Sequence, residues 1–548
     1  MSLRFTLILF TFLHFSLADY TWPNPALDEL EHITHVQTGL FGSGVVDRIS
    51  SCKTRVSQSD FSEQSPADWL RTAFHDVVSH DKAAGTGGLD ASIQWEINRS
   101  ENRGSHAFIG TLQFLAPFFS KRTTMSDLLA MATYTAVRNC GDAKLTMKAG
   151  RIDAPEPAPE GRVPGPHESI SELKQKFAHA GFDPKDMIQL VACGHTLGGV
   201  HKESFPEIVG NTTFSDFDKT EDRFDNRVAV EYLRGTTKNP LVRAEGGNNS
   251  DFKIFNSDGN STIRAMSSPD AFAQTCEQIL QRMIDTVPSA VTLSPLPPQT
   301  VKPYRPRLRL TKAGVLRLDG HIRIKKDDSY IKNVRLQYWD RNGNAVSDPI
   351  PTSLETAQGG VGKGQEANFY FYEIGQNQLD NGISKFNVVV TYLRGGQKVY
   401  DNNGNSYPIQ DTVLIQESQS CLAKSQAKNG IRTLTITAAV RSGLASQLQA
   451  SVVKRSKRSD TLVPQLSTES VEMKPWQNPV GGYALYTGSY PLPKESWDTT
   501  FDVWAEDSNG ARYEDAFRST DTLPESCARS SMSHRRHKFG RQSKPGFE

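Results

Sequence analysis

The chain has 548 residues, of which 37% are hydrophobic, and a formal net charge of +1. This length exceeds what one hydrophobic core normally supports, so we expect two to four domains. A nearly neutral chain has no global field that would attract a polyanion, so the composition favours neither nucleic acid nor a membrane surface as a partner. Six cysteines are too few for a disulfide-stapled scaffold.

Residues 1–18 predict a secretory signal peptide. Arg4 supplies the positive start, and an apolar run extends from Phe5 to Leu17 before the expected cleavage point after Ala18. An N-terminal core helix is the alternative. This run, and every later one, is shorter than a membrane span requires. We therefore expect a secreted protein in which disulfides can form. Four N-glycosylation sequons agree with export, at Asn98, Asn211, Asn248 and Asn260.

Residues 60–290 have mostly helical periodicity. Apolar residues recur at helical spacing in Asp127–Val137, where Ser126 or Asp127 is the expected N-cap. Ser169–His179 and Asp186–Leu190 follow the same pattern. These segments predict a mainly α-helical domain that covers residues 19–290 once the signal peptide is removed.

The pattern changes at Pro288, and the closely spaced prolines that follow mark a linker or an edge segment. Period-two alternation then appears in Arg307–Leu310, Val334–Trp339 and Phe386–Val390, separated by turn signals. This predicts an all-β domain of immunoglobulin or fibronectin-like sandwich type over residues 300–415.

A second block, residues 421–527, repeats this β pattern, for example in Thr433–Thr437. Cys421 and Cys527 bracket the block and could tie its ends together. The basic run Lys454–Arg458 is interpreted as a solvated loop, with a polyanion contact or a processing site as alternatives. The polar, basic tail, residues 528–548, is predicted to be disordered.

The most informative short motif is the pair Arg71 and His75. Residues four apart share one face of a helix, so the motif places a fixed cation beside an imidazole that can carry a proton. A second histidine, His195, lies 120 residues later in a Gly-His-Thr context. A cation, a general acid/base and a distant imidazole are what heterolytic cleavage of a peroxide on a haem iron requires. Taken alone, Arg71 and His75 would be an ordinary pair on a helix surface.

Together these motifs resemble the haem peroxidase superfamily of plants, fungi and bacteria, over about residues 45–285. The resemblance implies one haem b, reduction of H₂O₂ and oxidation of a small reducing substrate. Phe74 is similar to the distal aromatic residue of the secreted plant and fungal members, whereas intracellular cytochrome c peroxidases and the catalase-peroxidases carry Trp there. We therefore expect a secreted member of fungal type.

The resemblance assigns roles on both sides of the haem. His75 would act as general base and then general acid, and Arg71 would stabilise charge on the departing oxygen. Asn102 would accept a hydrogen bond from His75 Nδ1 and fix its tautomer. His195 would be the axial ligand, and Asp258 would accept its Nδ1–H; Asp225 is the competitor for this second role.

The resemblance also implies two structural Ca²⁺ ions, which prefer oxygen ligands. An acidic, solvated loop is the alternative for each site. The expected ligands of the distal ion are Asp76, the Gly88 carbonyl, Asp90 and Ser92. Those of the proximal ion are Thr196, Asp218, Thr220, the Arg223 carbonyl and Asp225.

Cys52 and Cys140 resemble one disulfide of this family. Cys276 resembles half of another, whose partner the sequence does not reveal. Cys193, two residues before His195, is interpreted as a small buried residue rather than a reactive thiol.

Departures from the family pattern bear on the electron donor. No Trp occurs between Trp95 and Trp339, so the radical-carrying proximal Trp of cytochrome c peroxidase is absent from the sequence. Leu190 stands where lignin-oxidising members can carry an exposed Trp, and His201 where manganese-oxidising members place an Asp. Ser204 or its neighbours replace the ascorbate-binding Arg. We therefore expect a small phenol or a similar donor.

The sequence thus predicts a secreted haem peroxidase with two C-terminal β-sandwiches. The alternative is a degenerate peroxidase fold that contacts a cell wall or polysaccharide through these sandwiches and serves adhesion. No metal cluster or nucleophile constellation is found in the C-terminal half.

Overall fold

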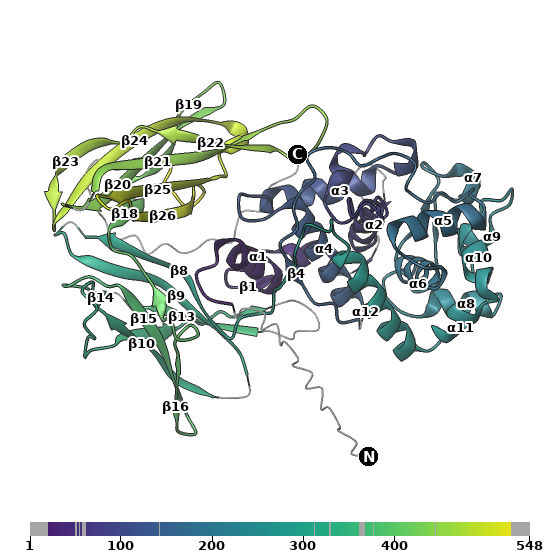
Figure 1. Cartoon of the computed structure of the whole chain (residues 1–548), viewed down its shortest axis with the longest axis horizontal. Helices are drawn as coiled ribbons and strands as arrows, with labels where there is room; N and C mark the ends of the chain where they lie inside the picture. Colours follow the sequence, from purple (N-terminus) through teal and green to yellow (C-terminus); the bar gives the residue numbers. More distant parts are fainter. Residues whose placement is uncertain are drawn as a thin grey trace, which may run out of the picture.

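The structure is a computed structural model of the full chain. It describes residues 20–49, 52–53, 55–56, 62–141, 143–311, 313–327, 330–360, 368–375, 377–443 and 445–527. The predicted signal peptide and the predicted C-terminal tail lie outside these residues. Two kinds of structure follow each other along the chain: a helical region over about residues 25–285, and then a long all-β antiparallel region with several sheets (Figure 1).

The helices of the first region bury their apolar faces against one another in one continuous core. Short strand pairs connect them: β2 (Arg55–Val56) with β3 (Ser62–Glu63), and β5 (Gly199–His201) with β6 (Phe214–Asp216). The helices are α1 (Pro25–His35), α2 (Ser65–Val77), α3 (His106–Leu115), α4 (Met125–Cys140), α5 (Ile170–Ala180), α6 (Pro184–Gly194), α7 (Pro206–Val209), α8 (Arg227–Leu233), α9 (Pro240–Arg243), α10 (Ser250–Phe255), α11 (Ser261–Ala265) and α12 (Pro269–Asp285).

Helix α4 lies at the centre of this core, because its residues are buried almost throughout. It begins two or three residues earlier than the sequence predicted. Its N-cap is Thr124, whose hydroxyl accepts a hydrogen bond from the Asp127 backbone nitrogen at 3.1 Å. The predicted caps, Ser126 and Asp127, therefore lie inside the helix. The Asp127 carboxylate forms a buried ion pair with Arg151, at 2.8 Å.

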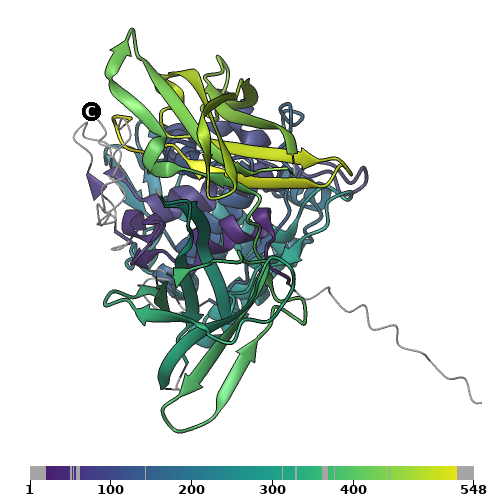
Figure 2. The same cartoon turned by 90° about the vertical axis from the view of Figure 1, so that its left-hand side faces the viewer.

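The β region begins with an 11-stranded sheet system that includes β1 (Thr38–Gly39) from the N-terminal part of the chain. Further along the chain, one sheet has the order β18-β20-β24-β23 with β19 beside β20, and another has the order β22-β21-β25-β26. Figure 2 shows the earlier strands (green) below the later ones (yellow-green). The strands are β7 (Ser294–Pro295), β8 (Val301–Leu310), β9 (Leu316–Lys325), β10 (Ile331–Trp339), β11 (Ile350–Leu354), β12 (Gly359–Gly360), β13 (Asn368–Ile374), β14 (Asn377–Gln378), β15 (Lys385–Tyr392), β16 (Gln397–Tyr400), β17 (Tyr407–Pro408), β18 (Val413–Ile415), β19 (Cys421–Lys428), β20 (Ile431–Arg441), β21 (Ala445–Ser456), β22 (Gln465–Val471), β23 (Lys474–Val480), β24 (Tyr483–Pro493), β25 (Thr500–Asp507) and β26 (Arg512–Ser519).

Strand β18 joins the two β units. Its residues lie at the end of the predicted first unit, residues 300–415, but β18 pairs with β20 of the second unit. Successive side chains of a strand point to opposite faces. Accordingly, Leu414 packs in the core of the first unit, while Val413 and Ile415 pack in the core of the second.

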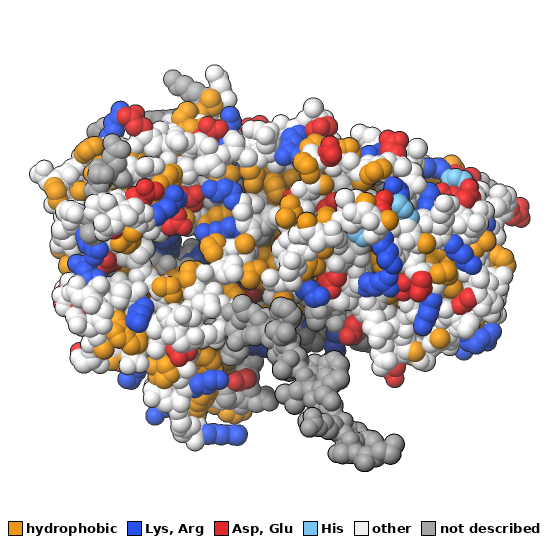
Figure 3. All heavy atoms as spheres, in the orientation of Figure 1, with side chains coloured by type: hydrophobic (Ala, Val, Ile, Leu, Met, Phe, Trp, Pro, Cys, Tyr) orange, Lys and Arg blue, Asp and Glu red, His pale blue; other side chains and the backbone are white. Residues whose placement is uncertain are grey.

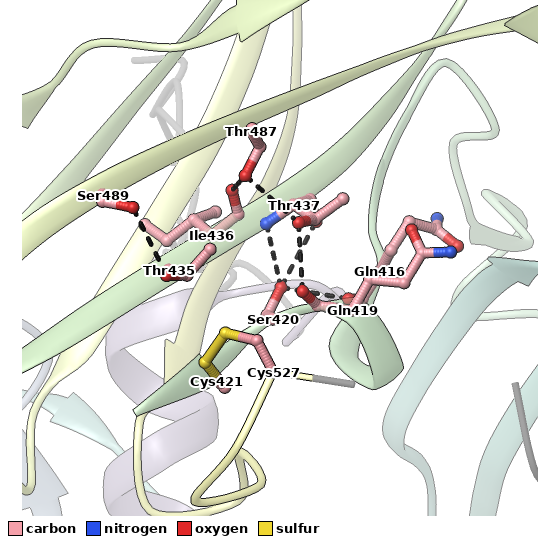
Figure 4. Close-up of a disulfide and its surroundings, with 10 residues drawn as sticks. All are labelled: Gln416, Gln419, Ser420, Cys421, Thr435, Ile436, Thr437, Thr487, Ser489 and Cys527. Carbon is pink, nitrogen blue, oxygen red and sulfur yellow. Dashed lines mark hydrogen bonds between the residues drawn. A yellow bond between two sulfur atoms is a disulfide. The ribbon is translucent and has the colours of Figure 1, made fainter. Parts of the chain in front are cut away.

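Three disulfides tie distant segments together in the described residues. Cys52 pairs with Cys140, and Cys421 with Cys527. Figure 4 shows the latter at the start of β19, beside Ser420, whose hydroxyl accepts a hydrogen bond from the Thr437 backbone nitrogen. The third disulfide joins Cys193 of α6 to Cys276 of α12. Cys193 is buried and is not a reactive thiol, as predicted, but the sequence did not reveal that it is the disulfide partner of Cys276.

Acidic and basic side chains are interspersed on the face of the molecule shown in Figure 3, as the net charge of +1 leads one to expect. Within the described residues, none of the helices has the length and apolar character that crossing a bilayer requires.

Candidate active site

A cavity of about 720 Å³ lies within the helical region. Its lining brings together residues far apart in the sequence: Arg71, Phe74 and His75 from α2, and His195, which follows α6. Apolar side chains such as Leu190, Phe177 and Phe217 complete much of the wall. The volume lies in the range typical of small-molecule and cofactor sites.

The His75 imidazole is held by a chain of hydrogen bonds. Its Nδ1 lies 2.8 Å from Asn102 Oδ1, and Asn102 Nδ2 donates to the Glu96 carbonyl oxygen at 2.9 Å. Because the Asn102 amide nitrogen faces a carbonyl acceptor, its oxygen must accept the proton of His75 Nδ1. His75 Nε2 is left with a free lone pair and is the nitrogen able to act as a base.

Burial in this cavity and, to a smaller extent, the nearby Arg71 charge lower the pKa of His75 to about 3. The Asn102 hydrogen bond opposes this shift. The imidazole is consequently neutral near pH 7 and ready to accept a proton. The ring also packs against Phe108, with 4.9 Å between the ring centroids, so its orientation is fixed by contact as well as by hydrogen bonding.

Arg71 is anchored by the backbone of the segment before α3. Its Nη1 donates to the Gly104 carbonyl oxygen at 3.1 Å, and its Nη2 donates to the carbonyl oxygen of Arg103. The guanidinium also lies over the Phe108 ring, 4.7 Å from its centroid. Burial lowers the pKa of Arg71 to about 10, so the side chain remains a fixed cation near neutral pH.

On the other side of the site, Nδ1 of His195 lies 2.9 Å from Oδ2 of Asp251. A carboxylate can only accept, so His195 Nδ1 carries the proton and Nε2 is available as a ligand atom. Asp251 is fully buried in the first turn of α10. The His195 ring also stacks on Phe217, with 4.3 Å between centroids and 14° between planes.

The sequence prediction that Asp258 holds His195 was wrong. Asp258 lies in a short 3₁₀ turn before α11 and caps that helix, because its carboxylate accepts hydrogen bonds from the Ser261 and Thr262 backbone nitrogens. The Asn-Ser-Asp pattern therefore marked a helix start. The competitor Asp225 does not contact His195 either; it accepts from Thr220 and from the Arg227 backbone nitrogen.

The sequence did contain a signal for Asp251. It begins the segment Asp-Phe-Lys-Ile-Phe, in which three of the four following residues are apolar, and a carboxylate buried with such residues needs a partner. The stacking of Phe217 on His195 had no comparable signal, because it depends on how the β5–β6 hairpin folds back over the end of α6.

The residues expected to bind the proximal calcium come together. Thr220 Oγ1 lies 3.2 Å from Asp218 Oδ1 and 3.0 Å from Asp225 Oδ1, and Thr196 Oγ1 donates to the Asp225 carbonyl oxygen at 2.6 Å. Arg223 follows in the same turn, its nitrogen bonded to the Thr220 carbonyl oxygen. Asp218 Oδ2 is buried and has no hydrogen-bond partner within the described residues.

Burial raises the pKa of Asp218 to about 7, and the carboxylates of Asp225 and Glu231 add to this effect. Such a group of buried oxygens is costly without a cation, so the residues fit the ion that the sequence predicted. No cluster of three or more His, Cys, Asp or Glu side chains able to hold a metal occurs in the described part of the chain. Calcium, however, also accepts the hydroxyl and carbonyl oxygens that this group contains.

The residues expected at the distal calcium are also adjacent, but they satisfy one another more fully. The buried Asp76 carboxylate accepts hydrogen bonds from the backbone nitrogens of Asp90, Ala91 and Ile93, and from the Ser92 hydroxyl. The Gly88 carbonyl oxygen accepts from the Asp90 nitrogen at 2.8 Å. Burial and the neighbouring Asp90 raise the pKa of Asp76.

The donor set of the cavity fits a haem. His195 offers one unused imidazole nitrogen, with its other nitrogen held by a buried carboxylate, the arrangement that metal-binding histidines commonly show. His75 and Arg71 line the same cavity, and the remaining wall is largely apolar. This cavity therefore has what an iron porphyrin requires: an axial imidazole, an apolar enclosure and a separate acid/base group.

Comparison with known sequences agrees with this geometry. A profile of the family named Peroxidase matches residues 50–268. A WSC domain-containing protein of Arthroderma benhamiae is 37% identical over 528 residues, which are 93% of this chain and 69% of that protein. The chain contains a domain of the haem peroxidase family.

More distant relatives match only about a third of this chain. L-ascorbate peroxidase 5, peroxisomal, of Arabidopsis thaliana is 35% identical over 177 residues, 31% of this chain and 58% of that protein. Manganese peroxidase H4 of Phanerodontia chrysosporium is 32% identical over 197 residues, 34% of this chain and 48% of that protein. Family membership suggests a peroxidase activity that uses haem and H₂O₂.

Proposed function

We propose that this chain is a secreted haem peroxidase of fungal type that reduces H₂O₂ and oxidises small phenolic donors in one-electron steps. The observation that carries the proposal is the convergence of His75, Arg71 and His195 on one cavity, each held by hydrogen bonds to its own partner residues. A bound haem b supplies the iron at which the O–O bond of the peroxide is broken.

In this proposal each side chain has one task. His195 Nε2 would bind the iron, and Asp251 would orient the ring through Nδ1. His75 Nε2 would take a proton from the inner oxygen of H₂O₂ and return it to the outer oxygen, which leaves as water. Arg71, fixed by the Gly104 and Arg103 carbonyl oxygens, would stabilise the negative charge on that departing oxygen.

The proposed electron donor is inferred from two residues of the cavity lining, His201 and Leu190. His201 lies beside His106, with 5.0 Å between the ring centroids, and burial lowers the pKa of His201 to about 4. Two imidazoles do not supply the carboxylate oxygens that manganese prefers. Leu190 is buried, so it offers no surface relay for electrons. A small organic donor that enters the cavity is therefore favoured over Mn²⁺ or a bulky polymer.

Two structural Ca²⁺ ions belong to the proposal, one at Asp218, Thr220, Asp225 and Thr196, and one in the loop ordered by Asp76. The alternative function, adhesion by a degenerate peroxidase fold, has less support. Degeneration would remove the need for the hydrogen-bonded array of His75, Asn102 and Glu96, which the chain retains.

A haem titration of the full-length protein tests the function. We expect purified protein to give a Soret band of ferric haem with one equivalent bound, and one equivalent of H₂O₂ to change that spectrum until a phenolic donor restores it. The variant His195→Ala should lose the native spectrum. A wild-type protein that binds no haem, or whose haem spectrum does not respond to peroxide, would overturn the enzyme proposal in favour of adhesion.

A further inference from the structure

The carboxylate that faces His195 accepts a second strong hydrogen bond. Asn239 Nδ2 donates to Asp251 Oδ2 at 2.8 Å, and this is the same oxygen that accepts from His195 Nδ1 at 2.9 Å. Asn239 is 1% exposed and Asp251 is 0% exposed, so both groups are shielded from water. The other oxygen, Oδ1, has a longer contact of 3.4 Å from the Ser250 hydroxyl.

The Asn239 side chain is itself fixed. Its Oδ1 accepts from the Leu241 backbone nitrogen at 2.8 Å and so caps α9, while the backbone nitrogen of Asn239 donates to the Thr237 hydroxyl at 3.0 Å. With the oxygen used by the cap, the amide NH₂ is directed at Asp251 with little freedom to turn away. The loop that joins α8 to α9 therefore holds the Asn239 amide in place against Asp251.

Two donors on one carboxylate oxygen compete for its electron density. The more strongly Oδ2 accepts from His195, the more the imidazole resembles an imidazolate, and the more electron density its Nε2 can give to a metal. A charge-assisted hydrogen bond from Asn239 draws on the same oxygen and weakens the pull on the His195 proton. Asn239 would therefore reduce the electron donation of the proximal histidine.

We propose that Asn239 is a positioning residue that sets the basicity of His195 through Asp251, and thereby the reduction potential of the haem. This inference rests on the proposed function for its effect on haem. The effect on the hydrogen bond between His195 and Asp251 does not require haem, because the three side chains are already connected in the protein itself.

Two variants distinguish the role of Asn239 as a hydrogen-bond donor to Asp251 from its role as the cap of α9. Asn239→Ser keeps a good N-cap but its hydroxyl is too short to reach Asp251, whereas Asn239→Ala removes both the cap and the donor. The full-length protein would be compared by ferric/ferrous midpoint potential and by the iron–histidine stretching frequency. Haem-free protein labelled with ¹⁵N-histidine would be compared by the proton resonance of His195 Nδ1–H.

We expect both variants to shift the midpoint potential to more negative values, to raise the stretching frequency and to move the Nδ1 proton resonance downfield, because Asp251 then accepts more strongly from His195. Asp251→Asn should shift the potential in the opposite direction. If Asn239→Ser leaves the midpoint potential, the stretching frequency and the Nδ1 proton resonance unchanged, the inference is overturned, whatever the effect of Asn239→Ala. Asn239 would then be a helix cap only. If the wild type binds no haem, the proposed function fails, and the haem-free resonance still decides the role of Asn239.

Discussion

The reactive nitrogen of each histidine in the candidate site is determined by what the other nitrogen touches. Asn102 occupies Nδ1 of His75 and Asp251 occupies Nδ1 of His195, so both rings have Nε2 free within the cavity. The two partners differ in charge. A neutral amide leaves His75 a simple base, whereas a carboxylate makes His195 a stronger electron donor.

Replacement of His75 tests its role as the base. The variant His75→Leu should bind haem as the wild type does, because His195 and its partners are untouched. Its rate of reaction with H₂O₂ should fall by about 10²–10⁴-fold, the range typical for loss of a general acid/base. Stopped-flow absorbance measures the rate. His179→Leu, which changes a histidine outside the cavity lining, serves as the control. An unchanged rate in His75→Leu would remove His75 from the mechanism.

At the scale of elements, short loops hold the carboxylates that are proposed to bind calcium. The turn from Asp218 to Asp225 folds its oxygens inward, and one oxygen of Asp218 is buried without a hydrogen bond in the described structure. The loop beyond Asp76 differs, since backbone nitrogens already satisfy that carboxylate. We therefore expect the proximal loop to depend on calcium more than the distal loop does.

Removal of calcium tests this difference. A chelator should lower the thermal unfolding midpoint of the wild type, because an ion that binds only the folded state stabilises it by about 2.7 kcal/mol at 100 times its dissociation constant. Asp218→Asn should lose most of this sensitivity, whereas Asp90→Asn should keep it. Differential scanning calorimetry with and without chelator measures the shift. Identical midpoints for the wild type in both conditions would show that neither loop holds an ion.

The hairpin of β21 and β22 docks on the helical region (Figure 1). Arg455 donates from Nη1 to the Phe119 carbonyl oxygen at 3.1 Å and from Nη2 to the Ala116 carbonyl oxygen at 2.7 Å. Arg458 lies over the Trp95 ring, and Val463 joins the helical core. The interpretation of this basic run as a solvated loop was therefore wrong for Arg455 and Arg458.

Loss of the Arg455 contacts should loosen this docking. Arg455→Met keeps much of the side-chain volume but leaves two carbonyl oxygens without their donor, so we expect the free energy of unfolding to fall by about 1–3 kcal/mol. Lys457→Met, in the same run but exposed, should change it little. Urea denaturation followed by tryptophan fluorescence compares the variants. Equal midpoints for the two variants would show that Arg455 contributes nothing to the docking.

At the scale of the whole molecule, α1 lies between the helical and the β regions. Its Glu31 is buried and bonded to Lys302 of β8 and to Arg323 of β9, while β1, just after α1, pairs with β12. A buried carboxylate shared by two cations is costly to break, because removal of either partner leaves an unpaired charge. The helical and β regions are thus joined by charge pairing as well as by apolar contact.

This junction should make stability depend on pH through His35 of α1. Burial lowers the pKa of His35 to about 4, while Glu31 and the Leu296 carbonyl oxygen raise it and Arg323 and Arg138 lower it. Between pH 6.5 and about 4 the unfolded chain binds a proton here that the folded chain does not. Stability should therefore fall with decreasing pH, by up to about 1.4 kcal/mol per pH unit from this group.

Thermal unfolding midpoints at pH 7, 6 and 5 measure this dependence. We expect the unfolding midpoint of His35→Gln to depend less on pH than that of the wild type over this range. The variant lacks the imidazole that binds a proton in the unfolded chain but not in the folded chain. His167→Gln, at an exposed position, should keep the wild-type dependence. If His35→Gln and the wild type lose stability in parallel as the pH falls, the buried His35 is not the group that titrates.

Much of the architecture was predictable from the sequence by itself, because the spacing of apolar residues along a segment indicates whether that segment is a helix or a strand. Helical and period-two spacing separated the helical region from the β region, and Arg71 and His75 share a helix face at any position of that helix in the fold. Asn102 beside His75, and the pairing of Cys52 with Cys140, followed from resemblance to family motifs and agree with the structure.

The tertiary structure alone decided which distant groups meet. Asp251 rather than Asp258 faces His195, Cys193 pairs with Cys276, and Arg455 binds the helical region. Each of these contacts depends on the path of the whole chain, since it joins residues 56 to 339 positions apart. Spacing along a sequence reports which residues share a helix face or a strand face, but a buried charge finds its partner by the packing of elements, and that packing is a property of the complete fold.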